Sequence, residues 1–190
     1  MIAETIHLIY IALGVLLIAL TLIYLIITYN RFVELRNLVA EAFSTMDVYL
    51  KKRWDLIPNL VEVVKGYAKH ERDLFENVVS LRNSSYDKMS LDEKIDTNEK
   101  VSAGLLKLFA VAENYPDLKA SQNFLDLSAQ LSKIEDEIAQ SRKYYNAVVR
   151  NMNTKIEMFP SNIVAGIFGF KRSKMFEALD EERKNVHVEL

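Results

Sequence analysis

The sequence predicts an all-α protein: a single N-terminal transmembrane helix followed by an antiparallel long-helix bundle with coiled-coil-like packing. The bundle would hold three long helices plus a short C-terminal helix. Three observations support this fold class: residues 5–30 carry no charged side chain, later apolar residues recur at steps of three and four, and only three prolines and five glycines occur in 190 residues. We expect a transmembrane anchor at residues 1–30, a cytoplasmic helical bundle at 31–178 and a charged tail at 179–190.

The predicted anchor is the apolar run from Ile6 to Thr28. A helix rises about 1.5 Å per residue, so roughly 20 such residues cross a hydrocarbon core of about 30 Å. A cleaved signal peptide is the alternative interpretation, but such peptides begin with basic residues and end at a cleavage site with small side chains. Residues 1–4 contain no Lys or Arg, and residues 23–29 offer no such site. We therefore predict a retained single-pass span in the lipid bilayer.

The basic residues that flank the anchor indicate its orientation. No Lys or Arg precedes it, whereas Arg31 and Arg36 follow closely, and basic flanks stay in the cytoplasm. We predict localisation in the cell (inner) membrane, with the N-terminus outside and the body cytoplasmic. The absence of cysteine fits a reducing compartment. The net charge of −2 argues against a protein that tracks phosphates, so we expect no nucleic acid partner.

The first helix of the body is expected to continue the anchor and to end near the polar cluster at residues 82–85. Its apolar seam alternates steps of three and four, a repeat that favours left-handed packing against partner helices. The seam is Phe32, Leu35, Val39, Ala42, Met46, Tyr49, Arg53, Leu56, Leu60, Val63, Tyr67, His70 and Leu74. Pro58 removes a backbone donor, so we expect a kink or break near residues 55–58. Gly66 costs about 1 kcal/mol relative to Ala, which close helix contact would offset.

The predicted bundle contains three further helices. The second runs from about residue 92 to 113, and Pro116 is well placed to open the third, which runs to about residue 157. The seam of the third helix is Phe124, Leu127, Leu131, Ile134, Ile138, Ser141, Tyr145, Val148 and Met152. After Pro160, the Ser161 hydroxyl is expected to cap a short apolar helix.

Residue types that carry catalysis or bind metals are scarce. The chain has no Cys and three His, and it lacks a nucleophile elbow and a glycine-rich phosphate loop. A di-iron bundle needs two Glu-x-x-His pairs, but Tyr67 and Lys184 stand three residues before His70 and His187. We therefore predict no enzyme, no catalytic residue, no cofactor and no metal site. We expect His70 to be a hydrogen-bonded core residue, with a ligand or proton-switch role as the alternative.

Two residues of the first helix are candidates for partner binding. Arg53 interrupts the apolar seam, so it would need Glu135 or Asp136 as a buried partner that fixes the helix register. A partner-binding contact is the alternative for Arg53. Trp54 is expected to pack half-exposed between helices, or else to be an interface hot spot.

The C-terminal apolar segment is the third candidate. Residues 163–170 are apolar on all sides and precede Lys171, Arg172 and Lys174. The segment either closes the end of the bundle or docks on a membrane interface or a partner. The predicted partner-binding residues are Arg53, Trp54, His70, Ile163, Ile167, Phe168 and Phe170.

Several motifs together resemble the bacterial LemA family. They are NRFVELRN at residues 30–37, DVYLKKRWDLIPNLVEVVKGYAKHE at 47–71, AENYPDLKA at 112–120 and FPSN at 159–162, with Asn123 to Leu125 and Tyr145-Asn146 between them. The resemblance covers about residues 28–178. Tyr49 stands where the family usually has glutamine, and Lys174 and Met175 replace a proline-containing stretch.

The resemblance implies one N-terminal span, a cytoplasmic antiparallel helical bundle and no established enzymatic activity. Some family members are encoded beside a membrane-bound heat-shock zinc protease, which implies other membrane proteins, among them a membrane protease, as partners in quality control. Our leading hypothesis is a membrane-anchored, non-enzymatic scaffold or adaptor that presents a long helical rod at the cytoplasmic face. One alternative is a self-assembling membrane-associated coat or ring, a homo-oligomer favoured by apolar residues off the seam such as Phe43, Phe75 and Val79. The other is a small-molecule or metal sensor that uses His70.

Overall fold

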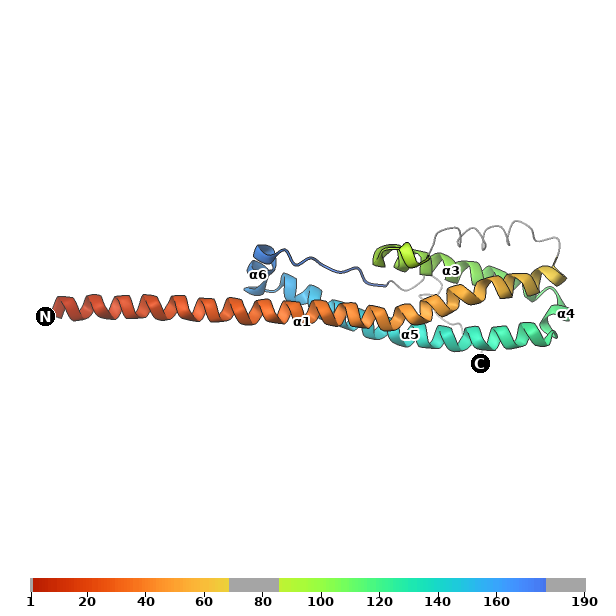
Figure 1. The fold of residues 1–190 in the computed structure, drawn as a ribbon, viewed down its shortest axis with the longest axis horizontal. Coiled ribbons are helices and arrows are strands. Elements are labelled where there is room, and N and C mark those ends of the chain that lie inside the picture. The colour runs from red at the N-terminus through yellow and green to blue at the C-terminus, as the bar shows by residue number, and fades with distance from the viewer. Residues whose placement is uncertain (1, 69–85, 177–190) are drawn as a thin grey trace, which may run out of the picture. The chain divides into compact units, whose positions relative to one another are not determined.

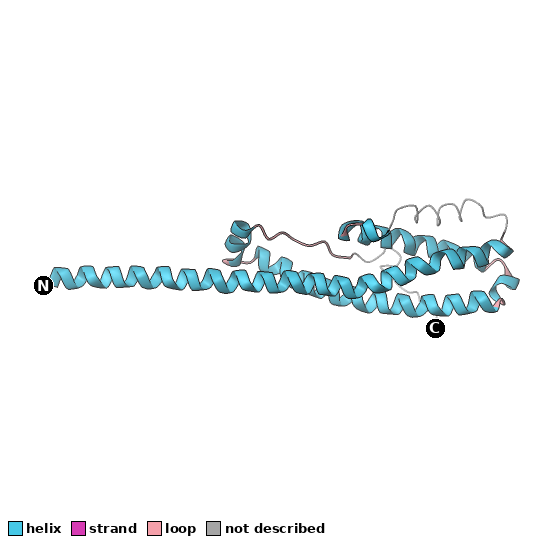
Figure 2. Cartoon of the chain, in the orientation of Figure 1, coloured by secondary structure: helices cyan, strands magenta, loops and turns pink. Residues whose placement is uncertain are grey.

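The computed structural model describes residues 2–68 and 86–176, and these residues form helices and connections without a strand (Figure 2). The helices are α1 (Ile2–Tyr67), the 3₁₀-helix η2 (Tyr86–Lys88), α3 (Leu91–Ala112), α4 (Pro116–Lys119), α5 (Gln122–Glu157) and α6 (Ser161–Phe168). The predicted all-α fold, with one long apolar N-terminal helix and a packed helical bundle, is confirmed.

The chain divides into two compact units, whose boundaries fall inside α1 and α5. Within the described residues, unit 1 holds 2–41 and 147–173, and unit 2 holds 42–68, 86–146 and 174–176. Unit 1 therefore contains the apolar start of α1, the end of α5 and all of α6. Unit 2 contains the end of α1, most of α5 and the whole of η2, α3 and α4.

The N-terminal part of α1 presents its apolar side chains to the surroundings. Leu16, for example, keeps 56% of its surface exposed, and the large apolar residues on either side of it are similarly uncovered. Among the described residues, α1 is the one helix that is long and apolar enough to cross a membrane. Burial within α1 begins at Thr28 and Phe32, where α6 lies beside it in unit 1 (Figure 1).

The prediction that the body helix continues the anchor is confirmed, because α1 is one helix from Ile2 to Tyr67. Of the kink or break expected near Pro58, the break is wrong, since the proline lies inside that helix, and the kink stays a prediction. A proline in a helix interior costs about 3 kcal/mol. The neighbouring Ile57, Leu60 and Val61 are buried, and each such burial contributes about 1.5–3 kcal/mol, which is enough to hold the helix together.

The end of α1 also differs from expectation. The helix ends at Tyr67, before the polar cluster, and residues 69–85 lie outside the described residues. Gly66 lies in its last turn, where the low helix propensity of glycine favours an end. Among residues 2–68 and 86–176, nothing makes the close contact expected at Gly66: a Cβ there would meet no atom within 4 Å.

The predicted seam of α1 is buried or half-buried as far as Val63, and the buried face widens beyond Met46. Phe32, Leu35, Val39, Ala42, Met46, Arg53 and Leu60 are buried and Tyr49, Leu56 and Val63 are half-buried, whereas Tyr67 is exposed. The last two seam positions, His70 and Leu74, lie outside the described residues. The buried residues off the seam after Met46 are Leu50, Trp54, Ile57, Val61, Val64 and Ala68. In unit 2, α1 contacts both α3 and α5, so it needs a wider buried face than a two-helix seam supplies.

The second predicted helix corresponds to α3, which begins at a capping box. Ser90 Oγ accepts the Glu93 backbone N–H at 3.3 Å, and the Glu93 carboxylate accepts the Ser90 backbone N–H at 2.7 Å. Pairing two otherwise unpartnered backbone donors in this way fixes the start of the helix.

The third predicted helix is divided into α4 and α5. Pro116 opens α4 as expected, but α4 ends at Lys119 and α5 begins at Gln122. Ser121 lies between them and its carbonyl accepts the Leu125 N–H, consistent with the preference of serine for positions just before a helix. The predicted seam of α5 is confirmed, because each of its members is buried or half-buried.

The short C-terminal helix α6 forms as predicted, but Ser161 does not cap it. The residue before the helix is Pro160, and no side chain caps the helix start. The Ser161 hydroxyl lies 2.6 Å from Lys155 O and 2.9 Å from Met158 O, so it donates to carbonyls at the end of α5. Gly169, with φ of 72°, ends α6 in the left-handed conformation that glycine adopts readily.

Candidate functional site

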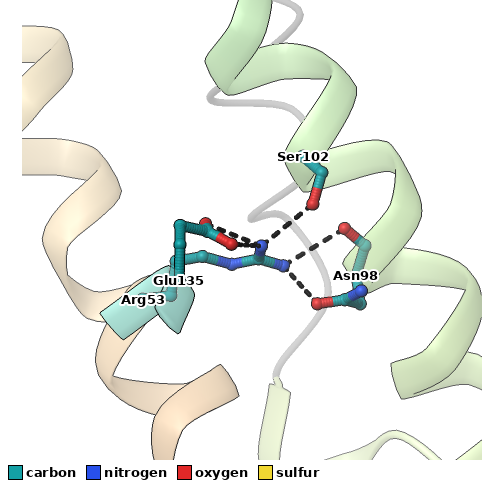
Figure 3. Close-up of polar contacts among 4 residues, drawn as sticks. All are labelled: Arg53, Asn98, Ser102 and Glu135. Carbon is teal, nitrogen blue, oxygen red and sulfur yellow. Dashed lines mark hydrogen bonds and ion pairs between the residues drawn. The ribbon is translucent and has the colours of Figure 1, made fainter. Parts of the chain in front are cut away.

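A buried arginine joins three helices of unit 2 (Figure 3). Arg53 on α1 is 2% exposed, and its guanidinium points at residues of α3 and α5. Nη1 donates to Ser102 Oγ at 2.9 Å and to the Glu135 carboxylate at 2.9 and 3.1 Å. Nη2 donates to the Asn98 backbone carbonyl at 3.1 Å and to the Asn98 side-chain oxygen. We call Arg53, Asn98, Ser102 and Glu135 the arginine cluster.

The arginine cluster fits a structural role, in which it holds α1, α3 and α5 together. A guanidinium has five donors in a planar fork, so a single side chain can satisfy acceptors on two neighbouring helices at once. Asn98 is also buried, whereas Glu135 keeps 41% of its side chain exposed and retains contact with solvent. The predicted pairing of Arg53 with Glu135 is confirmed. Arg53 lines a cleft of about 250 Å³ together with Asp136, Arg142 and others, so one side of the arginine cluster is open to the surface.

A second polar network lies one to two turns before Arg53 on α1. The Asp47 carboxylate accepts the Tyr86 hydroxyl at 2.6 Å and the Lys94 ammonium at 2.7 Å. Burial, and then the hydrogen bond to Asp47, raise the pKa of Tyr86 above its ordinary value. The Lys94 ammonium also lies 4.6 Å from the centre of the Tyr86 ring. Asp47 therefore ties α1 to η2 and α3.

Trp54 completes this region as a packing residue. It is buried, and its ring centre lies 5.4 Å from that of Tyr86. The expectation that Trp54 is half-exposed is wrong, because the wider buried face of α1 includes it. Arg53 and Trp54 contact neighbouring helices, and a role for either in partner binding stays a prediction.

Helix α6 has one covered face and one uncovered face, both within unit 1. Val164 and Ala165 pack on Phe32, where Leu25, Ile156 and Phe170 extend the cluster. On the other face Ile163, Ile167 and Phe168 are exposed. The four predicted residues of this segment are therefore divided between an apolar contact with α1 and a free apolar surface.

The LemA family model matches residues 42–190. The chain belongs to the LemA family. LemA is not a known family of enzymes.

Named relatives of this LemA-family chain include proteins from three bacteria. Protein LemA of Metamycoplasma hominis is 29% identical over 161 residues, covering 83% of this chain and 72% of that protein. Magnetosome protein MamQ 2 of Paramagnetospirillum magneticum is 25% identical over 179 residues, covering 80% of this chain and 66% of that protein. Magnetosome protein MamQ of Magnetospirillum gryphiswaldense is 25% identical over 178 residues, covering 80% of this chain and 65% of that protein.

The remaining predicted site residue of this LemA-family chain, His70, lies outside the described residues. Within residues 2–68 and 86–176, no group of three or more His, Cys, Asp or Glu side chains is placed to hold a metal ion.

Sequence reasoning missed two asparagines of α5 that hold the chain after α6. In unit 1, Asn153 exchanges two hydrogen bonds with the backbone of Ser173, at 2.9 and 3.0 Å. In unit 2, Asn146 does the same with the backbone of Phe176, at 2.8 and 2.9 Å. The available signal was their spacing of seven residues, which places both side chains on the same face of a helix.

Proposed function

We propose that this protein is a membrane-anchored, non-enzymatic scaffold or adaptor, with its helical body at the cytoplasmic face of the cell (inner) membrane. The observation that carries the proposal is the uncovered apolar surface of α1 before Thr28. Twenty or so adjacent residues there expose apolar side chains and carry no charge. Exposed apolar surface costs roughly 25 cal/mol per Å² in water, and a lipid core removes that cost.

The orientation in this proposal comes from the flanking charges. Arg31 and Arg36 follow the span in unit 1, and the segment before it contains no basic residue. Basic flanks are retained in the cytoplasm during insertion. The lipid bilayer is then the first partner of the protein. The proposed role of the scaffold is in membrane protein quality control. Its further partners would be other membrane proteins, with a membrane protease among them.

The non-enzymatic part of the proposal is supported by how the buried charges are used. Both Nη atoms of Arg53 and both carboxylate oxygens of Asp47 form hydrogen bonds with neighbouring helices. The relatives are named for the LemA family and for the magnetosome, and these names specify no reaction. Both observations fit a helical body that acts by binding partners on its surface and not through a catalytic centre.

Cysteine labelling tests the anchor and its orientation, because the natural chain has no cysteine. We expect a membrane-impermeant maleimide to label Ala3→Cys on intact cells and to label Lys133→Cys, an exposed position on α5, after permeabilisation only. Labelling of Lys133→Cys on intact cells would contradict the orientation. Extraction of the chain by alkaline carbonate would contradict the anchor itself.

Crosslinking in native membranes tests the scaffold role. We expect adducts that contain this chain and a second membrane protein, identified by mass spectrometry. A complete absence of such adducts would contradict a scaffold.

A self-assembling coat is the second candidate function. Exposed Val48, Leu106, Leu125 and Tyr144 on unit 2 favour it. Phe43 does not, because it is buried with its ring 5.9 Å from that of Tyr145, and Phe75 and Val79 lie outside the described residues. A detergent-solubilised particle with the mass of one chain would contradict the coat. The sensor hypothesis depends on His70, which also lies outside the described residues, so it stays a prediction.

A further inference from the structure

An apolar surface next to the end of the span has no cover within unit 1. It consists of the free face of α6 and the connection before it: Met158, Phe159, Ile163, Ile167 and Phe168, which we call the α6 patch. Phe159 is 79% exposed and Ile167 is 66% exposed. The opposite face of α6 is fixed by the burial of Val164 and Ala165 against Phe32, so the patch cannot turn inward without breaking that contact.

The contacts of α6 place the patch near the end of the span. The cluster around Phe32 includes Leu25, and the Tyr29 ring centre lies 4.7 Å from that of Phe168. The first charged residue after the span is Arg31. At about 1.5 Å per residue, these contacts extend from Leu25, about 9 Å inside the plane of Arg31, to Phe32, one residue beyond it. Helices that lie in a membrane interface bury their apolar face by about 5–10 Å, a depth within this range.

The polar groups around α6 also suit the boundary between lipid and water. Tyr29 lies at this level in contact with Phe168 and Phe170, and tyrosine is enriched at such boundaries. A cleft of about 410 Å³ beside them is lined by Arg36, Lys171 and Arg172 among others. Arg172 pairs with Glu157 at 2.7 Å, so apolar contact rather than net positive charge is the main attraction.

The segment that carries these basic residues is held in place. Asn153 makes two hydrogen bonds to the backbone of Ser173, directly after Arg172. The Phe170 ring lies 4.8 Å from that of Phe32, centre to centre. Both ends of residues 170–173 are therefore attached to the helices of unit 1, and the cationic side of the cleft is preformed.

We propose that the α6 patch is a second membrane contact, which lies in the lipid interface beside the cytoplasmic end of the α1 span. The occupant of the patch is a phospholipid bilayer, because the patch continues the lipid-facing surface of α1 at interfacial depth. This proposal rests on the membrane anchoring of α1 and adds that α6 fixes unit 1 against the bilayer surface.

Site-specific fluorescence in vesicles tests the proposal with the full chain. Single cysteines at Ile167, Leu125 and Leu16, each labelled with an environment-sensitive dye, would be reconstituted in phosphatidylcholine–phosphatidylglycerol vesicles that carry nitroxide lipids. Leu125 is the matched control, since it is an exposed leucine (48%) on α5 in unit 2. We expect shallow nitroxides to quench the dye in Ile167→Cys, deep nitroxides to quench it in Leu16→Cys, and neither to quench it in Leu125→Cys.

The outcomes separate the patch from the anchor. If the dye in Leu16→Cys is quenched and that in Ile167→Cys is not, the α6 proposal is overturned and the anchor stands. If neither is quenched, the anchor fails as well. A dye in Ile167→Cys that is shielded from aqueous iodide without lipid quenching would indicate a second copy or another protein on the patch, and would also overturn the proposal. As a second variant, Ile167→Glu should abolish lipid quenching of a dye in Phe159→Cys, whereas Leu125→Glu should leave it unchanged.

Discussion

Replacing Arg53 by methionine should destabilise unit 2 because it leaves a buried acceptor without a donor. The substitution keeps a long, flexible side chain and removes every hydrogen bond of the guanidinium. The side-chain oxygen of Asn98 loses its partner, and Asn98 is buried, whereas the Asn98 backbone carbonyl lies inside α3 and keeps its helical hydrogen bond. Glu135 and Ser102 are less buried and can turn to water.

The expected magnitude follows from this one acceptor. An unsatisfied buried acceptor costs about 1–3 kcal/mol. Removing a buried charge returns part of that cost, because arginine no longer has to be desolvated. We therefore expect a loss of about 2 kcal/mol in the free energy of unfolding. For a chain of this size, that loss lowers Tm by roughly 4–8 °C.

Tryptophan fluorescence offers a direct assay. Trp54 is the only tryptophan, it is buried, and it neighbours Arg53 in sequence. Urea titrations of the full chain in mild detergent would therefore report on unit 2. Lys51→Met is the matched control, because Lys51 lies on the same helix and pairs with Asp55 in an exposed ion pair at 2.6 Å. Such pairs contribute about 0–1 kcal/mol.

A rescue variant identifies the cause of the loss. Replacing both partners of a buried hydrogen bond by apolar groups is close to neutral. Asn98→Leu, added to Arg53→Met, removes the side-chain acceptor and should restore most of the lost stability. The reasoning is refuted if Arg53→Met costs no more than Lys51→Met, or if the double variant is as unstable as the two single losses combined.

Two further predictions concern other parts of unit 2. Gly66→Ala should raise the free energy of unfolding by up to about 1 kcal/mol, because the position is helical and exposed and a Cβ there meets nothing within 4 Å; a loss in the same urea titration would contradict this. Burial, followed by the charge of Asp92, raises the pKa of Tyr145 to about 12, whereas an unfolded tyrosine titrates near 10. The folded state therefore holds this proton more tightly, so stability should be constant below about pH 10 and fall between about pH 10 and 12. Tyr145→Phe should make that fall shallower, and an unchanged slope would contradict the assignment; Tyr86 has its pKa raised as well and contributes in the same direction.

The long helices could be predicted from the sequence because their buried residues recur at steps of three and four. The seam of α5 alternates steps of three and four, and all its members are buried or half-buried. The seam of α1 accounts for only part of the buried face after Met46, because two helices contact α1 there and the sequence of one helix does not state how many neighbours it has. The same wider face explains why Trp54 is buried.

The arginine cluster could be predicted in part. A charge within an apolar seam requires a partner, which led to Glu135 on α5. Asn98 and Ser102 could not be found in this way, since neutral polar residues on a helix are equally compatible with a solvated face. Asn146 and Asn153 were not predicted for a related reason. They bind the backbone of the segment after α6, at Phe176 and Ser173, and the sequence does not indicate which backbone groups a side chain will bind.

The hydrophobicity of the C-terminal apolar segment, residues 163–170, does not indicate its role. A segment that is apolar on all sides fits both the closure of a bundle and a docking element, and the sequence could not decide between them. In the structure one face of this eight-residue helix closes unit 1, and a docking role for the other face stays a proposal. Val164 and Ala165 close against Phe32 while Ile163 and Ile167 stay exposed. A segment that served only to close unit 1 would need apolar side chains on one face alone, so the second apolar face calls for an apolar environment outside the chain.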